Sequence, residues 1–290
     1  MDIITTLING LSLGGIYAMI ALGYTMVYGI AKMLNFAHGD IIMAGGYTIF
    51  VLLNMTGNPI AAILGAVVFC VVLGVVIEKV AYKPLRGASP LAVLITAIGV
   101  SYLLQSLAQI IFGSASKMVI IAELGTVKIG ALSLQVHTLI TLACTIVVMI
   151  ILSLFVKFTK TGRAMVAVSE DKGAAQLMGI NVNKIITITF AIGSALAALA
   201  GLFYLLKSPS LSNTLGSLPG IKAFTAAVIG GIGSIPGAML GGILLGLIEA
   251  ISYKVTVIAP YTDAIEFSIL IIILLVRPTG FLGKKIREKV

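Results

Sequence analysis

The residues of this sequence that could do chemistry in an apolar environment are isolated carboxyl and imidazole groups. His38 stands two residues before Asp40, and Glu249 and Glu266 lie inside apolar runs. A charge at the centre of a bilayer costs roughly 2.5–3.5 kcal/mol, so each glutamate should face the protein interior, a cavity or the interface. His38 and Asp40 could relay a proton in a secondary transporter, although such a pair at a membrane edge more often caps a turn.

Motifs for bound cofactors are missing. His38 and His137 are far apart, with no metal-ligand spacing around either, so we expect no metal site. The phosphate-loop pattern Gly-x-x-x-x-Gly-Lys-Ser/Thr does not occur, and the nearest stretch, 280–285, has the wrong spacing. Cys70 and Cys144 fall in apolar runs, which predicts no disulfide. The sequence therefore predicts no enzyme site and no cofactor in this chain.

The composition indicates which kind of fold must position these residues. Hydrophobic residues make up 59% of the 290 residues, charged residues 10%, and the mean hydropathy is +1.16. A soluble domain could not expose such a surface without aggregating. We predict an all-α membrane protein, a single domain over 1–290 that forms a polytopic bundle of about eight transmembrane helices. No basic residue precedes Lys32, so the first apolar run should remain a membrane span rather than a cleaved signal.

Six uninterrupted apolar runs of membrane-spanning length and two interrupted ones account for eight spans. The uninterrupted runs are 3–30, 60–80, 91–112, 136–156, 185–206 and 262–276. The interrupted elements lie near 31–54 and 221–253, each with a short helix expected after the break. Paired broken helices are the best sequence indication of a transport pathway. The alternative is that both breaks are tight turns between packed helices.

The two interruptions and the polar residues within the spans supply the candidate pathway residues. They are Asn35, His38, Gly39, Asp40, Asn54, Gln105, Gln109, Gly230, Gly231, Gly233, Pro236 and Gly237. Broken helices offer oriented backbone dipoles without the cost of buried charges.

Basic residues mark the topology of the chain. The net charge of +9 would suggest a nucleic-acid partner in a soluble protein, but here the positions of the charges predict membrane sidedness and no nucleic acid. One side of the predicted layout carries 14 of the 19 basic residues: Lys32, Lys79, Lys83, Arg86, Lys157, Lys160, Arg163, Lys172, Lys184, Arg277, Lys284, Lys285, Arg287 and Lys289. The other side carries Lys117, Lys128, Lys207, Lys222 and Lys254. The positive-inside rule then predicts an outer N-terminus and a cytoplasmic tail, 277–290.

The loop 157–184 is the longest charged segment, and it lies on the predicted cytoplasmic side. Residues 172–178 are expected to form a short helix that Ser169 caps, with Glu170 and Asp171 in its first turn and Gly179 at its end. Such a helix offers a compact surface to another protein. The alternative is a connector that its charges keep in water.

Five ordered motifs resemble one family, the permease subunits of branched-chain amino acid ABC transporters of the LivH type. They are LNFAHGD at 34–40, KPLR at 83–86, GRA at 162–164 leading to SED at 169–171 and LMGIN at 177–181, GGIGSIPGA at 230–238 and RPTG at 277–280. The resemblance implies a permease of a prokaryotic cytoplasmic (inner) membrane that pairs with a second homologous permease. Two ABC ATPase subunits that bind ATP, an extracytoplasmic substrate-binding protein and membrane lipid would be its further partners.

The resemblance also assigns the loop 157–184 as the segment that couples the permease to an ATPase. The implied coupling residues are Gly162, Arg163 and Ala164, which lead into it, Ser169, Glu170 and Asp171, which begin the coupling helix, and Ala174, Ala175, Leu177 and Gly179, which form its docking face. The implied cargo is a branched-chain amino acid. Similar permeases for urea, short amides or other amino acids, or a stand-alone secondary transporter, remain the alternatives.

Overall fold

The computed structural model describes residues 3–122, 124–129 and 132–283. Within them, eight helical segments are long and apolar enough to cross a membrane, which confirms the predicted helical membrane fold. The helices are α1 (Ile3–Ala31), α2 (His38–Thr56), α3 (Pro59–Ile77), α4 (Pro90–Phe112), α5 (Val136–Phe158), α6 (Lys160–Glu170), α7 (Lys172–Leu177), α8 (Val182–Lys207), α9 (Ser217–Gly230), α10 (Ile235–Lys254) and α11 (Thr262–Val276). A π-helical turn (Glu78–Tyr82) and short 3-10 turns (Lys83–Leu85 and Ala259–Tyr261) extend α3 and precede α11.

Helix α1 is the centre of the bundle, and it packs most extensively on α10 and α8. Small residues bring α1 and α10 together, as the small-xxx-small spacing of Gly10 and Gly14 predicts. A Cβ atom on Gly246 would lie 2.1 Å from the backbone nitrogen of Gly14, and one on Gly242 would lie 2.4 Å from that of Ala18. No side chain fits between these two backbones, so they are locked in register.

Helix α8 holds α2 and α3 on the other side of α1. A Cβ atom on Gly201 would lie 2.9 Å from the carbonyl oxygen of Ile42, and Ala197 is fully buried. Gly201 therefore marks the surface of α8 on which α2 packs.

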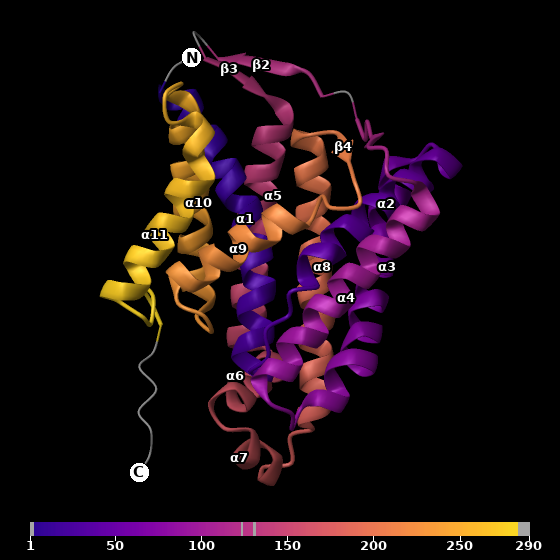
Figure 1. The fold of residues 1–290 in the computed structure, drawn as a ribbon, viewed down its shortest axis with the longest axis vertical. Coiled ribbons are helices and arrows are strands. Elements are labelled where there is room, and N and C mark those ends of the chain that lie inside the picture. Colours follow the sequence, from indigo (N-terminus) through magenta and orange to yellow (C-terminus); the bar gives the residue numbers. More distant parts are fainter. Residues whose placement is uncertain (1–2, 123, 130–131, 284–290) are drawn as a thin grey trace.

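The two ends of the bundle differ in structure (Figure 1). At one end lie the start of α1 and the antiparallel hairpin of β2 (Thr126–Ile129) and β3 (Leu132–Gln135). Two further short strands, β1 (Lys117–Met118) and β4 (Ser210–Leu211), pair with each other. At the opposite end lie α6 and α7. The loop 157–184 and the loop 113–135 thus occupy opposite ends, as predicted.

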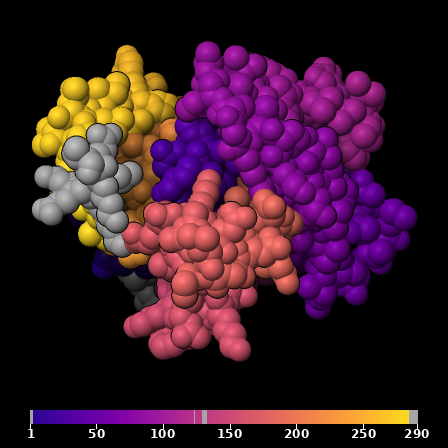
Figure 2. Space-filling view, turned by 90° about the horizontal axis from the view of Figure 1, so that it is seen from below, coloured from indigo at the N-terminus to yellow at the C-terminus, as the bar shows by residue number. Residues whose placement is uncertain are grey.

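Seen from the α7 end, one side of the molecule is hollowed (Figure 2). Indigo atoms of the N-terminal segment lie recessed between the purple atoms of the α3 and α4 region and the yellow atoms of the C-terminal helices. Helix α9 crosses this region in Figure 1.

Two details of the predicted broken elements are wrong. Helices α2 and α10 contain 19 and 20 residues, so each is about 28–30 Å long rather than short. The short element is α9, whose 14 residues cover roughly 21 Å. The sequence reading placed its first turns in a loop that ended at Lys222.

The chain after α11 returns to the α9–α10 turn. The backbone nitrogens of Phe281 and Leu282 donate to the carbonyl oxygens of Ile229 and Gly230, each at 2.9 Å. The predicted tail 277–290 is thus anchored at its beginning, and residues 284–290 lie outside the described part of the chain.

Candidate functional site

A cavity of about 240 Å³ lies where the first turns of α2 and α9 meet α1 and α4. Its lining combines one carboxylate with amide, hydroxyl and aromatic groups: Tyr24, Phe36, Gly39, Asp40, Ile98, Ser101, Tyr102, Gln105, Gly216, Ser217, Gly220 and Ile221. The structure thus brings the predicted pathway residues Gly39, Asp40 and Gln105 to one place.

Asp40 is the charged group of this cavity, and it is 2% exposed. The side-chain amide of Gln105 donates a hydrogen bond to its Oδ1 over 2.9 Å, and the same nitrogen lies 3.2 Å from the hydroxyl oxygens of Ser101 and Ser217. Asp40 also lies in the first turn of α2, where the helix dipole stabilises a negative charge. Gln105 therefore joins α2, α4 and α9 around the carboxylate.

Backbone contact between two glycines closes one wall of the cavity. A Cβ atom on Gly39 would lie 2.5 Å from the carbonyl oxygen of Gly216, and one on Gly216 would lie 1.7 Å from that of Gly39. Each position therefore excludes a side chain. This contact fixes the first turn of α9 against that of α2.

His38 and Asn35 pack beside the cavity rather than in it. His38 is 1% exposed, its ring lies edge-on to Tyr24 at 4.8 Å, and a Cβ atom on Gly23 would come within 2.2 Å of its Nε2. The Tyr82 hydroxyl donates to the Asn35 Oδ1 over 2.8 Å. The break between α1 and α2 is therefore folded back against the middle of α1, inside the bundle, as irregular backbone at membrane depth requires.

Two other predicted pathway residues lie away from the carboxylate. Gln109, one turn along α4 from Gln105, accepts a hydrogen bond from Asn213 over 3.4 Å. Asn54 is exposed and donates to the Phe50 carbonyl of its own helix, outside this cavity.

The glycines of the second predicted break form a packing turn outside this cavity. A Cβ atom on Gly230 would lie 1.9 Å from the carbonyl oxygen of Gly237, and Gly231 has φ +105° and lies against Gly283. Pro236 lies in the first turn of α10, where its missing N–H costs nothing. The set Gly230, Gly231, Gly233, Pro236 and Gly237 therefore fits the alternative of a tight interhelical turn.

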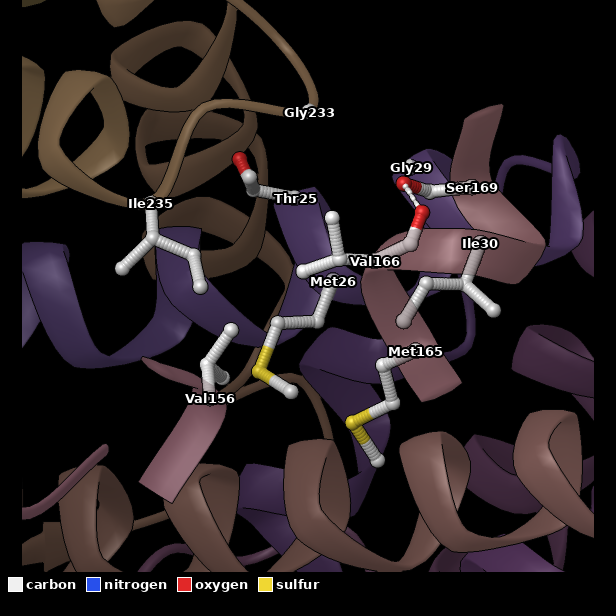
Figure 3. A pocket seen from close by; sticks show the side chains of 10 residues that line it. All are labelled: Thr25, Met26, Gly29, Ile30, Val156, Met165, Val166, Ser169, Gly233 and Ile235. Carbon is white, nitrogen blue, oxygen red and sulfur yellow. Dashed lines mark hydrogen bonds between the residues drawn. The ribbon is translucent and has the colours of Figure 1, made fainter. Parts of the chain in front are cut away.

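A smaller cavity of about 60 Å³ separates this turn from α6 (Figure 3). Its sides are Gly233 and Ile235 of the turn and α10, Met26 of α1, and Met165 and Val166 of α6.

The short helix predicted at 172–178 is present as α7, but its cap differs from the prediction. The Asp171 carboxylate accepts from the backbone nitrogens of Gly173 and Ala174 over 2.8 and 3.0 Å, so Asp171 is the N-cap. Ser169 and Glu170 belong to the last turn of α6, a separate helix that the sequence reading missed. Gly179, with φ +82°, ends the element as predicted.

The apolar end of α7 is strongly exposed. Leu177 and Met178 are 91% and 82% exposed, whereas Ala175 is 4% exposed. Ala174 and Gly179 are exposed as expected for a docking face, and Ala175 faces the protein's own core, so its placement on that face is wrong.

The residues that lead into the coupling segment serve different roles. Gly162 is buried, and a Cβ atom there would lie 2.4 Å from the Phe155 carbonyl oxygen, so no side chain fits at this position. Arg163 is exposed and Ala164 is half-buried. Lys172 ties α7 to the bundle: its Nζ donates to the carbonyl oxygen of Ala31, the last residue of α1, over 2.7 Å. Burial, and then the positive charges nearby, lower the pKa of the Lys172 ammonium.

A buried ion cluster joins α9, α10 and α11, and the sequence reading missed its cation. Lys222 lies 3.0 Å from Glu249, 2.8 Å from Asp263 and 3.2 Å from Glu266, and the Tyr17 hydroxyl donates to Glu249 over 2.7 Å. Both membrane glutamates are buried in the protein interior, one of the three locations predicted for them. Lys222 is 2% exposed, so counting it as an exposed loop residue was wrong. Two glutamates within predicted spans need a buried cation, and this need was the signal in the sequence that could have identified Lys222 as their partner.

A second buried ion pair lies near the α7 end of the bundle. Glu78 is fully buried, pairs with Arg86, and accepts a hydrogen bond from Thr187 over 2.9 Å. Arg86 also donates to Asn183. This group joins the end of α3 to the start of α8, immediately after α7.

Comparison with known proteins gives a consistent result. The family model for the permease component of branched-chain amino acid transport systems matches residues 6–274. The chain is 44% identical to the high-affinity branched-chain amino acid transport system permease protein BraD of Pseudomonas aeruginosa, over 98% of this chain and 97% of that protein. It is 41% identical to the LivH permease protein of Escherichia coli, over 97% and 96% of the two chains. A probable LivH permease of Methanocaldococcus jannaschii is 30% identical over 91% of this chain and 88% of its own length.

Proposed function

Because this chain belongs to the family of permease components of branched-chain amino acid transport systems, we propose that it forms half of the membrane pathway of an ATP-driven importer for branched-chain amino acids. It is a multi-pass membrane protein. In this proposal ATP is bound and hydrolysed by two separate ATPase subunits, and the chain itself needs no nucleotide site.

The observation that carries the proposal is the exposed end of α7. Leu177 and Met178 place two large apolar side chains in solvent at the tip of the bundle, where nothing in the described chain covers them. Exposed apolar groups on a polar segment are typical of a protein interface. An ATPase groove is the partner that fits a permease of this family.

Movement of α7 would reach the cavity through α1. Lys172 binds the last carbonyl of α1, and the chain then passes directly into the break at 32–37 and the first turn of α2. ATP-driven closure of the ATPases would push α7, and packed helices would carry that displacement to Asp40.

The hollow side supports a second permease as the partner within the membrane. The rim residues Ile98, Tyr102 and Ile221 are 42%, 67% and 47% exposed and apolar or aromatic. A second homologous permease covering this side would close the pathway between the two subunits. In the proposed orientation α7 is cytoplasmic, and the hairpin end, with the N-terminus, faces the extracytoplasmic binding protein.

Reconstitution tests this function. Proteoliposomes that contain this chain, its partner permease and both ATPases should accumulate labelled leucine when ATP is inside and loaded binding protein is outside. Liposomes with this chain alone should accumulate none. Uptake by the single chain driven by a proton gradient would instead support a secondary transporter.

A further inference from the structure

We propose that Asp40 binds the ammonium group of the transported amino acid in the 240 Å³ cavity. The inference rests on the function proposed above and identifies where the substrate is held and by which charge. Ile98, Tyr102 and Ile221, which line the same cavity, would contact the apolar side chain of the transported amino acid.

Asp40 differs from the other buried carboxylates of the described chain. Four acidic side chains there are buried: Asp40, Glu78, Glu249 and Glu266. Glu78 pairs with Arg86, and Lys222 pairs with both of the other glutamates. No lysine or arginine of the described residues forms an ion pair with Asp40. A buried carboxylate without a cation is costly, and the neutral Gln105 amide, the Ser101 hydroxyl and the α2 dipole compensate that cost only in part.

The space beside Asp40 has the size of a small molecule. A single water needs roughly 10–15 Å³ of accessible cavity volume, so 240 Å³ accommodates an amino acid with several waters. Two tyrosines, Tyr24 and Tyr102, also line it, and aromatic faces attract ammonium groups. The missing cation and the available volume occur at the same place.

The remaining polar groups suit the other half of a zwitterion. The Gln105 side-chain nitrogen lies within 3.2 Å of both the Asp40 carboxylate and the Ser217 hydroxyl, so these two groups are no more than roughly 6 Å apart. Ser217 begins the 14-residue helix α9, whose positive dipole end favours a carboxylate. A neutral amide such as urea would leave Asp40 unpaired, so the cavity favours amino acids over that alternative cargo.

Substitution of Asp40 in the complete reconstituted importer tests the site. Asp40→Asn keeps the size and removes the charge, and should lower ATP-driven leucine uptake about tenfold or more, because a charge-assisted hydrogen bond is lost. Asp40→Glu should retain more uptake than Asp40→Asn. The matched control is Asp263→Asn, which removes a membrane carboxylate while Lys222 keeps two partners, and it should transport within about twofold of the unsubstituted importer.

The outcomes separate the site from the function. Normal uptake by Asp40→Asn would overturn the site and leave the proposed function intact. Absence of uptake by the unsubstituted importer would overturn the function itself.

A second measurement decides the case in which Asp40→Asn does not assemble. In an importer whose Cys70 and Cys144 are replaced by Ala, Tyr102→Cys places a thiol on the cavity rim. Leucine delivered by the binding protein at ten times its half-saturating concentration should slow thiol modification by aminoethyl methanethiosulfonate about tenfold. Tyr253→Cys, which is exposed on α10 outside the cavity, should react at an unchanged rate. Equal reaction rates at Tyr102→Cys with and without leucine would overturn the proposal.

Discussion

Replacing Lys222 by Met removes the single cation from the ion cluster that holds α9 against α10 and α11. The side chain is 3% exposed and lies within 3.2 Å of each of three carboxylates. Glu249 and Glu266 are then left buried without a cation, while Asp263 is half exposed and can be solvated. Removing one partner of a buried ion pair costs about 3–5 kcal/mol.

The cost of protonating a carboxylate gives a second estimate of this loss of stability, of similar magnitude, and shows that the loss depends on pH. Neutralising a glutamate with a reference pKa of about 4.3 at pH 7 costs roughly 3.7 kcal/mol, and at pH 5 roughly 1 kcal/mol. Because two glutamates lose their cation, Lys222→Met should lower the free energy of unfolding by at least about 3–5 kcal/mol at pH 7, and by much less at pH 5. Titration with sodium dodecyl sulfate in mixed micelles measures both values.

Three variants make the result interpretable. Lys222→Arg keeps the charge and should be the milder change. Lys207→Met removes an exposed lysine near the cluster and should stay within about 0.5 kcal/mol of the unsubstituted protein. Adding Glu249→Gln and Glu266→Gln to Lys222→Met should restore much of the loss. Equal stability of Lys222→Met and the unsubstituted chain, or a loss that does not change between pH 7 and pH 5, would refute this reasoning.

Three further predictions concern the coupling helix and the cavity. Leu177→Glu should reduce ATP-driven uptake at least about tenfold in proteoliposomes without changing the yield of folded chain, because this side chain is 91% exposed and the substitution would disrupt its proposed contact with an ATPase; normal uptake would contradict that role. Ala175→Asp should instead reduce the yield of folded chain in detergent chromatography, because the site is 4% exposed and an unpaired charge would be buried. Gly216→Ala should destabilise the protein by about 1–3 kcal/mol in the same detergent titration, because its Cβ atom would overlap a carbonyl oxygen of α2; an unchanged titration midpoint would contradict the close packing.

The spans were predictable because each is a long apolar run with clear ends. The predicted run 91–112 matches α4, which begins at Pro90 after the Ser89 cap, and the run 262–276 matches α11. Small-residue spacing also predicted a real contact, since Gly10 and Gly14 pack on α10.

Helix α9 was not predictable by the same reasoning. Its 14 residues are too few for a span, and its beginning carries Ser217, Pro219 and Gly220, which are typical of a loop. Only tertiary contacts, with Gly39 and with the acidic partners of Lys222, make this segment a buried helix. Local sequence carries no signal for either contact.

The candidate site was predictable in part. The break at 35–40 identified Gly39 and Asp40, and Gln105 was among the polar residues within the predicted spans, which the structure places on Asp40. The second break does not contribute to the cavity, because glycines that permit a packing turn and glycines that line a pathway look the same in sequence.

Chemical cross-linking from α7 tests the central claim most directly. In the assembled importer without native cysteines, a photoreactive cross-linker on Leu177→Cys should yield an adduct with an ATPase subunit. The same reagent on Met55→Cys, at the exposed far end of α2, should yield none. An adduct with the ATPase from Met55→Cys, or none from Leu177→Cys, would contradict a permease that separate ATPases move through α7.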